Sequence, residues 1–190
     1  MKRTAFWRQP LGWLLPLLLL LLGSNCGRAL QAHYARYADT RVYVVRHAEK
    51  ELTPGLADPP LTPVGQQRAL ALRDSLARKG VTVIFSTATT RTRATAQPLA
   101  TLRQLSIQPY DARQLPGLVR RIRREYPGQT VLVIGHSNTI LETVEALGAK
   151  RPVSAVQDSE YDYLLEVRLP ADTTQAATVV ARRYGAASGR

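Results

Sequence analysis

Three short runs of β-branched and apolar residues constrain the fold of this chain more than any other feature. They are Arg41–Arg46 (RVYVVR), Val81–Phe85 (VTVIF) and Thr130–Ile134 (TVLVI). Continuous apolar runs of this length are typical of strands that are buried on both faces, as in parallel sheets. Segments of helical composition separate the runs, so strand and helix alternate along the chain. The sequence therefore predicts a three-layer α/β/α sandwich with a mostly parallel central sheet.

Proline, glycine and threonine residues mark where the helices begin and end. Thr62 and Pro63 form an N-cap followed by proline at the first helical position, and Gly80 ends that helix. A second helix spans 88–104, in which Pro98 is expected to introduce a kink or a new turn. The other expected elements are helices over 116–126 and 138–147 and strands over 107–110, 161–169 and 178–182, the last two near a sheet edge.

The first 26 residues have the layout of a secretory signal. A basic start without acidic residues precedes the apolar run 11–22, and small and polar residues follow as far as Cys26. The run is shorter than the roughly 20 apolar residues that span a bilayer. Two alternatives stay open: an uncleaved N-terminal anchor, and a lipoprotein leader in which Cys26 carries the lipid. In each case the expected location is outside the cytoplasm of a bacterium, periplasmic or membrane-anchored.

Length and composition fit one globular domain behind this leader. We expect a leader over 1–26, a linker over 27–40 and a single domain over 41–185 in the chain of 190 residues. Its single cysteine excludes a disulfide scaffold, and its 45% hydrophobic content excludes a mainly disordered chain. Lysine and arginine outnumber acidic residues by 26 to 14, a formal net charge of +12 that favours anionic partners.

Histidine and arginine side chains stand where the predicted strands end. Arg46 and His47 close the first strand, Arg91 opens the helix after the second, and His136 follows the TVLVI strand. Open α/β sheets place their sites at the carboxyl ends of the strands, so we expect these four side chains to meet. Guanidinium groups bind phosphate oxygens, and a neutral imidazole is a competent nucleophile. The pattern therefore indicates chemistry on a phosphoryl group.

Four motifs in this order resemble those of the histidine phosphatase superfamily, branch 1, which includes phosphoglycerate mutases and small phosphohistidine phosphatases. They are Arg46-His47, Leu61-Thr62-Pro63-x-Gly65, the segment from Thr87 through Arg91-Thr92 to Thr95-Ala96, and Gly135-His136-Ser137-Asn138. The resemblance spans residues 41–147 and implies the phosphoglycerate mutase-like α/β sandwich that the strand pattern predicts. It also implies that His47 takes the phosphoryl group while Arg46, Arg91 and His136 surround the phosphate. Ser137 and Asn138 would add backbone N–H donors from the next helix start.

The general acid is the missing part of the pattern. Many branch-1 relatives have a glutamate after the third strand, whereas the comparable stretch here contains Asp111 and no glutamate. We take Asp111 as the candidate acid, with no protein acid at all as the alternative. Glu49 matches a family position that orients rather than donates a proton. The missing glutamate disfavours a mutase and leaves a phosphatase that acts on a phosphomonoester or a phosphoramidate.

Other functions receive little support from the residues. The scattered histidines give no metal site, no glycine loop for a nucleotide is present, and nothing beyond net charge suggests nucleic acid. We therefore expect a metal-independent phosphatase without a cofactor, acting on a phosphorylated small molecule or phosphoprotein. The rival hypothesis is a membrane-tethered domain that binds a phosphate ligand without turnover. The run of arginines at 120, 121, 123 and 124 favours a solvated helix, although anionic lipid is an alternative if Cys26 is lipidated.

Overall fold

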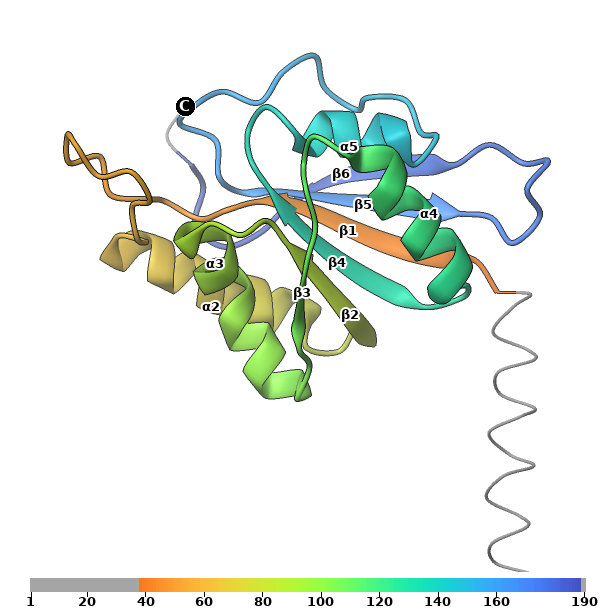
Figure 1. Ribbon diagram of the computed structural model, residues 1–190, viewed down its shortest axis with the longest axis horizontal. Helices are drawn as coiled ribbons and strands as arrows, with labels where there is room; N and C mark the ends of the chain where they lie inside the picture. Colours follow the sequence, from red (N-terminus) through yellow and green to blue (C-terminus); the bar gives the residue numbers. More distant parts are fainter. Residues whose placement is uncertain (1–37, 189–190) are drawn as a thin grey trace, which may run out of the picture. The chain divides into compact units, whose positions relative to one another are not determined.

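A six-stranded sheet forms the middle layer of the computed structural model, which describes residues 38–188 (Figure 1). The strand order is β3-β2-β4-β1-β5-β6. The first four strands of this order are mutually parallel, whereas β5 and β6 are antiparallel to their neighbours. The strands are β1 (Thr40–Arg46), β2 (Val81–Ser86), β3 (Ile107–Pro109), β4 (Thr130–Gly135), β5 (Tyr163–Leu169) and β6 (Thr178–Arg183).

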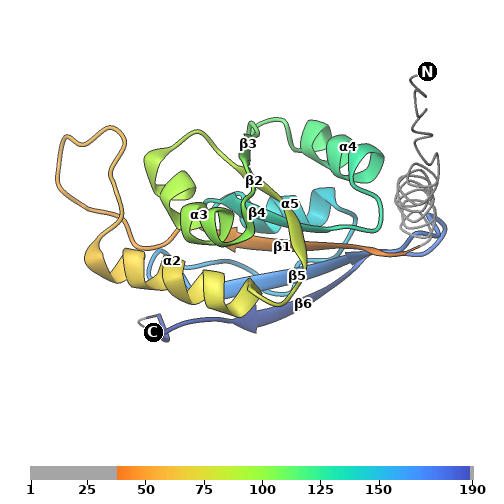
Figure 2. The same cartoon turned by 90° about the horizontal axis from the view of Figure 1, so that it is seen from below.

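Two pairs of helices cover the two faces of the sheet (Figures 1 and 2). Helices α2 (Pro63–Leu76) and α3 (Thr90–Arg103) bury their apolar side chains with Tyr43 of β1. Helices α4 (Leu115–Glu125) and α5 (Ile140–Ala146) pack with Val44, the next residue of the same strand. Successive side chains of a strand point to opposite faces, which divides the core in this way. The expected three-layer α/β/α sandwich is confirmed.

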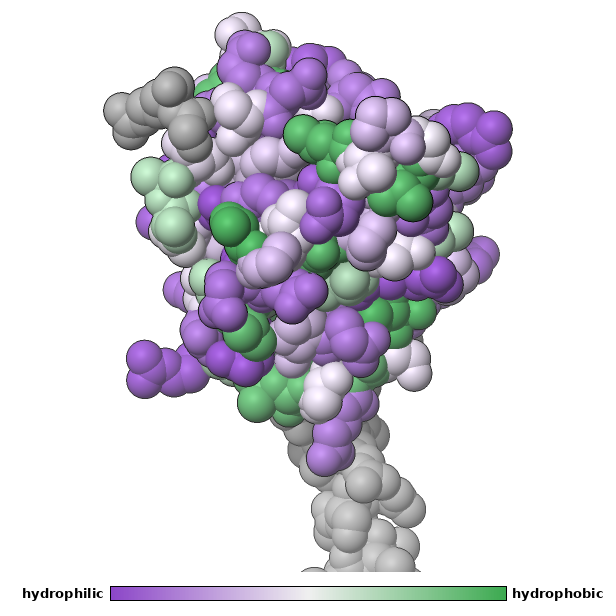
Figure 3. Space-filling view, turned by 90° about the vertical axis from the view of Figure 1, so that its left-hand side faces the viewer, coloured by the Kyte–Doolittle hydropathy of each residue, from purple (hydrophilic) through white to green (hydrophobic). Residues whose placement is uncertain are grey.

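The register of the central strands brings their carboxyl ends to one edge. Arg46 of β1 pairs with Gly135 of β4, and the backbone N–H of His47 donates to the Gly135 carbonyl at 2.9 Å. Ser86, the last residue of β2, pairs with Ile134 of β4. The residues after these three strands therefore share one face of the molecule. Figure 3 shows that face, which is mainly hydrophilic with separate hydrophobic patches.

Two expectations about helices need correction. Helix α3 continues through Pro98 as one element, so the expected new turn is absent there. Its buried residues, including Leu99, pack against the sheet, and this burial offsets the missing N–H of the proline. Helix α5 begins at Ile140 rather than near residue 138, because the carbonyl of His136 accepts from the N–H groups of Thr139 and Ile140 to form a turn.

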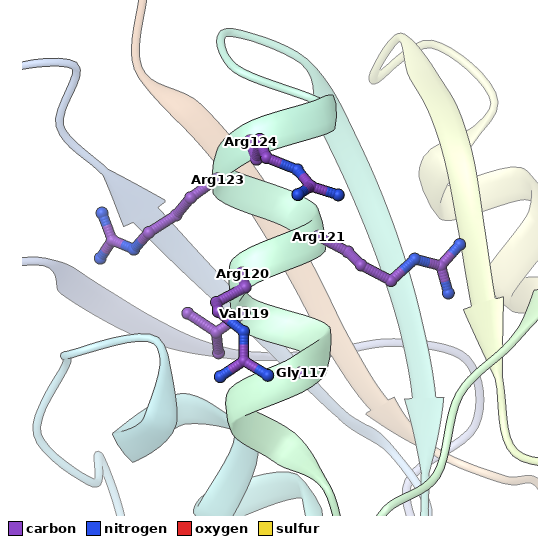
Figure 4. A pocket seen from close by; sticks show the side chains of 6 residues that line it. All are labelled: Gly117, Val119, Arg120, Arg121, Arg123 and Arg124. Atoms are coloured by element: carbon purple, nitrogen blue, oxygen red, sulfur yellow. The ribbon is translucent and has the colours of Figure 1, made fainter.

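The four arginines of α4 differ in whether they bond to neighbouring elements. Figure 4 shows that they fan around the helix, with Arg121 and Arg123 extending to opposite sides. Arg121 donates to the Gln108 side chain at 2.6 Å and lies over the Phe85 ring, and Arg123 donates to a backbone carbonyl at 3.0 Å. These two anchor the helix to its neighbours, so the prediction of a fully solvated basic helix holds for only part of the run.

The predicted leader and Cys26 lie outside the described residues, as do most positions of the predicted linker. Within residues 38–188, no helix has the length and apolar character required to cross a membrane. Strand β1 begins at Thr40, and ordered contacts continue to Ser188, which donates from its backbone to Asp162.

Candidate active site

His47 is a buried imidazole with one nitrogen already committed. The residue follows β1 and is 3% exposed, and its Nδ1 lies 2.8 Å from the carbonyl oxygen of Ala48. A carbonyl oxygen only accepts, so Nδ1 carries the hydrogen and donates it. In the neutral ring the lone pair is then on Nε2. The local backbone thereby selects the tautomer in which Nε2 can act as a nucleophile.

Burial and neighbouring cations keep both site histidines neutral. Burial is the main cause that lowers the pKa of His47 to about 3, and Arg46, His136 and Arg91 lower it further while the hydrogen bond to Ala48 opposes the shift. Burial also lowers the pKa of His136, again with help from the two arginines. The two rings lie edge to face with centroids 5.4 Å apart. Both are therefore uncharged at neutral pH.

Arg46 is fixed by the loop that precedes β5. Its Nη1 donates to the backbone carbonyls of Gln157, Asp158 and Glu160, each at 3.0 Å. Its guanidinium carbon lies 3.9 Å from the centre of the Tyr161 ring, and the residue is 4% exposed. A planar guanidinium that is stacked and hydrogen-bonded along one side keeps a fixed direction.

Arg91 is oriented by a carboxylate from the loop after His47. Asp58 accepts from the backbone N–H of Thr90 at 2.9 Å and from its hydroxyl at 2.7 Å, and lies 3.4 Å from Arg91 Nη1. These hydrogen bonds from Thr90 are the main cause that lowers the pKa of Asp58. The carboxylate therefore caps the start of α3 and pairs with the arginine in that first turn.

The two arginines each have a buried donor that is unpaired within residues 38–188. These donors are the Nε–H groups of Arg46 and Arg91. An unpaired buried donor on a charged group is costly, and native proteins keep such groups rare. Two of them beside the same imidazole are suited to the oxygens of a phosphoryl group.

His136 is oriented by threonines from the segment between β2 and α3. Its Nε2 lies 3.0 Å from the hydroxyl of Thr87, which in turn lies 3.0 Å from the hydroxyl of Thr92. With Nε2 engaged, Nδ1 is the ring nitrogen left for a ligand. Both threonines belong to a motif quoted from the sequence, and the structure adds a contact from Thr87 to a site histidine.

Ser137 and Asn138 lie in the turn between β4 and α5. No intramolecular hydrogen bond involves their backbone N–H groups within residues 38–188. Their role as donors to phosphate stays a prediction.

Asp111 is an exposed carboxylate in an ion pair. It accepts from the side chain of Arg113 at 3.2 Å and from the backbone N–H of the same residue at 2.9 Å. The hydrogen bond from the Arg113 side chain is the main cause that lowers the pKa of Asp111. An acid must carry a proton before it donates one, so this environment disfavours the predicted role at neutral pH. That role stays a prediction.

The Leu-Thr-Pro-x-Gly motif supports the segment that follows His47. The Glu49 carbonyl accepts from the N–H of Thr62 at 3.0 Å, and the Thr62 hydroxyl accepts from the N–H of Gly65 to cap α2. A Cβ atom at Gly65 would lie 2.1 Å from the Glu49 carbonyl oxygen, so only glycine fits there. The Glu49 carboxylate accepts from Arg68 at 2.7 to 2.9 Å, which agrees with an orienting role.

Three residues at or near the site were not singled out by sequence: Asp58, Arg68 and Tyr161. Each reaches the site through tertiary contacts, and none belongs to a strand end. Thr87 was part of a sequence motif and directly follows β2, but its contact with His136 was not predicted.

Comparisons with known proteins agree with this architecture. The sequence model of the histidine phosphatase superfamily (branch 1) matches residues 42–113, while no curated protein sequence matches the chain. A structure assigned as the phosphohistidine phosphatase SixA of Agrobacterium tumefaciens has a TM-score of 0.54 and 24% identity, covering 77% of this chain and 97% of its own. The mycobacterial glucosyl-3-phosphoglycerate phosphatase has a TM-score of 0.59 and 14% identity, covering 78% and 100%. The phosphoserine phosphatase of Entamoeba histolytica has a TM-score of 0.57 and 13% identity, covering 76% and 96%.

These solved structures show the fold, and the sequence model of the family matches part of the chain. The matched region contains His47 and Arg91, and the structure brings His136, which lies beyond that region, next to His47. The match to this family model supports a phosphoric monoester hydrolase. The matched model, the shared fold and the paired histidines at the strand ends thus all agree with the resemblance to the histidine phosphatase superfamily, branch 1.

Proposed function

We propose that this protein is an exported, metal-independent phosphatase that hydrolyses a phosphomonoester or a phosphoramidate through a phosphohistidine intermediate on His47. The state of His47 carries this proposal. It is a buried, neutral imidazole whose Nδ1 hydrogen is bound by Ala48, and it lies beside a second histidine and two arginines. This arrangement combines an available nucleophile with fixed positive charge for the transferring group.

The reaction has two displacements at phosphorus. In the first, the Nε2 lone pair of His47 forms a bond to phosphorus, and the bond to the leaving group breaks with its electron pair. The ring then carries a positive charge, which the hydrogen bond to the Ala48 carbonyl stabilises. In the second, water attacks phosphorus, the P–Nε2 bond breaks, its electrons return to Nε2, and phosphate and a proton leave. Arg46, Arg91 and His136 stabilise the charge on the phosphoryl oxygens in both steps.

The leaving group decides which substrates suit this site. Asp58 and Asp111 both have a lowered pKa, so neither carboxyl group supplies a proton readily at neutral pH. An aryl phosphate releases its aryloxide as a stable anion when the P–O bond breaks, and the nitrogen of a phosphoramidate can leave after taking a proton from solvent. We therefore expect these classes to react faster than alkyl phosphates. The names of the solved relatives, which include a phosphohistidine and a phosphoserine phosphatase, support phosphorylated small molecules or phosphoproteins as substrates.

Hydrolysis of p-nitrophenyl phosphate in the presence of EDTA tests the proposal. We expect turnover by the wild-type chain and loss of more than about 10³-fold in kcat for His47→Ala. The control is His33→Ala, which should change kcat little because His33 lies in the predicted linker over 27–40. A labelled donor should leave acid-labile, base-stable label on the wild-type chain and none on His47→Ala. Phosphate binding without turnover of aryl phosphates or phosphoramidates would instead support the rival hypothesis, a tethered phosphate-binding domain. The lowered pKa values of both carboxyl groups favour that rival.

Export and membrane attachment belong to the same proposal. The basic and apolar leader and Cys26 support them, and α4 keeps Arg120 and Arg124 on its outer side. Fractionation of bacterial cells and labelling with an alkyne-tagged fatty acid test both points. Label that Cys26→Ser abolishes would support a lipoprotein, whereas protein retained in the cytoplasm would contradict export.

A further inference from the structure

Arg68 is a buried cation that the proposed reaction does not use. It lies on α2, and its side chain is 4% exposed. Its Nε and Nη2 donate to the Glu49 carboxylate at 2.7 to 2.9 Å. Its Nη1 donates to the carbonyls of Tyr184 at 3.3 Å and Ala186 at 2.9 Å. Arg68 therefore joins the segment after His47 to residues 184–188, which we call the C-terminal segment.

The first arm of this connection leads to the tautomer of His47. The carbonyl that accepts the Nδ1 hydrogen belongs to the peptide unit between Ala48 and Glu49. Glu49 is fixed at its side chain by Arg68 and at its own carbonyl by the N–H of Thr62. Because the direction of a carbonyl follows the orientation of its peptide unit, the contact with Arg68 sets the acceptor that selects the reactive tautomer.

The second arm leads to Arg46. The hydroxyl of Ser188 accepts from the backbone N–H of Tyr161 at 2.8 Å, and the N–H of Ser188 donates to the Asp162 carboxylate at 3.3 Å. The N–H of Tyr184 donates to the Asp162 carbonyl at 3.0 Å. The Tyr161 ring packs on the guanidinium of Arg46. The C-terminal segment thus fixes the residue that packs on a phosphate-binding arginine.

The backbone of the C-terminal segment is shaped to fit against α2. Gly185 has a φ of +67°, a region that favours glycine. A Cβ atom at this position would lie 3.1 Å from the Cβ of Ala71 and 3.4 Å from Nη1 of Arg68. A larger residue would therefore press on the same guanidinium that holds Glu49.

We propose that Arg68 and the C-terminal segment form a positioning clamp for the phosphoryl site. Arg68 fixes the tautomer of His47 through Glu49, and the C-terminal segment fixes Arg46 through Tyr161. Arg68 contacts neither Nε2 of His47 nor the phosphorus atom of the proposed reaction, and it acts only through Glu49 and the C-terminal segment. The proposal rests on the proposed function, because it takes His47 as the nucleophile.

Nitrogen NMR of the histidines in the full chain, purified in mild detergent, tests the first arm. Long-range ¹H–¹⁵N spectra distinguish the two tautomers, and His47→Ala assigns the signal. We expect wild-type His47 in the Nδ1–H form and a mixture of tautomers in Arg68→Gln. For p-nitrophenyl phosphate, kcat of Arg68→Gln should fall about 10-fold to 100-fold with KM changed less than about twofold. Arg68→Lys should recover part of this loss.

The matched control is Arg73→Gln. Arg73 lies on the same helix in an exposed pair with Asp74, so its removal should leave both the His47 tautomer and kcat unchanged.

Ser188→Ala tests the second arm. It should weaken the binding of inorganic phosphate several-fold, which is about 1 kcal/mol for one lost hydrogen bond, and leave the His47 tautomer unchanged. Unchanged phosphate binding in folded Ser188→Ala would overturn the second arm.

A folded Arg68→Gln with the wild-type His47 spectrum and wild-type kcat would overturn the first arm. If Arg68→Gln does not fold, Glu49→Gln decides the question, since it breaks the same ion pair and should produce the same mixture of tautomers. A wild-type chain without turnover would refute the proposed function alone, because the tautomer and phosphate-binding measurements need no turnover.

Discussion

The two guanidinium groups beside the paired imidazole rings, whose centroids lie 5.4 Å apart, repel positive charge on either ring. At the residue scale this repulsion adds to burial, which withdraws solvation from a charged ring. Each ring then uses one nitrogen for a fixed contact, His47 with Ala48 and His136 with Thr87. The second nitrogen of each ring is left for phosphorus or its oxygens. These contacts thus fix the protonation state and the orientation of both imidazole rings before a substrate binds.

The lowered pKa of His47 predicts its behaviour in acid. The native ring takes up a proton only near pH 3, whereas the unfolded ring does so near its ordinary pKa of 6.5. The unfolded state therefore binds more protons between these values, and stability should fall as pH falls from about 6.5 toward 3. An NMR titration should show neutral His47 at pH 5, and denaturant unfolding should show His47→Gln losing less stability than wild type over this range. A His47 that titrates near pH 6.5 would contradict the burial argument.

Thr87→Val should separate the orientation of His136 from its presence. The change removes the hydroxyl at Nε2 and keeps the volume, so we expect kcat/KM to fall about tenfold, the equivalent of one hydrogen bond. Thr89→Val is the control, because the Thr89 hydroxyl contacts Thr92 and not a histidine. Steady-state kinetics with p-nitrophenyl phosphate measures both. Equal losses in the two variants would mean that the threonine cluster acts only through packing.

At the element scale, the start of α2 and the segment after β1 are in direct backbone contact at Gly65. Adding one methyl group there places it 2.1 Å from the Glu49 carbonyl oxygen, so either the helix or the His47 segment must shift. We expect Gly65→Ala to lower the free energy of unfolding by about 1–3 kcal/mol and to reduce kcat. Chemical denaturation and steady-state kinetics measure the two effects.

Gly117→Ala provides the opposite case on α4. The nearest atom to its added Cβ is 3.9 Å away, so the change should stabilise the helix by about 0.4–1 kcal/mol and leave kcat as it is. If the two glycine variants behave alike, close contact with Glu49 is not what requires glycine at residue 65.

The elements themselves could largely be predicted from sequence, because local patterns determine them. The three apolar runs became β1, β2 and β4 within a residue of their expected ends. Of the two outcomes expected at Pro98, the new turn is absent, since the cost of a proline is local while the burial of Leu99 that offsets it is tertiary. The four motif residues that meet at the strand ends were predictable for the same local reason, because parallel strands share an edge.

At the scale of the whole molecule, the supports of the site were beyond sequence reasoning. Arg46 contacts the carbonyl of Glu160 across 114 positions, and Arg68 contacts that of Ala186 across 118. No periodicity or spacing indicates such pairs, because they depend on β5 and β6 adding to the sheet beside β1. The sequence could therefore predict the four side chains that meet at the strand ends but not the residues that hold them in place.

The net charge of +12 also belongs to the whole molecule, and it allows long-range attraction to be separated from contact. Salt screens exposed charges over about 10 Å at 0.1 M, so the affinity for inorganic phosphate should fall several-fold between about 0.05 and 0.5 M KCl. Arg91→Gln should weaken binding and flatten this dependence, because Arg91 lies at the site. Arg78→Gln removes the same charge from the exposed turn before β2, at the opposite edge of the sheet. It should leave the affinity for phosphate and its salt dependence nearly unchanged. Titration calorimetry across the salt series measures this, and equal effects of the two variants would show that net charge, not contact, governs binding.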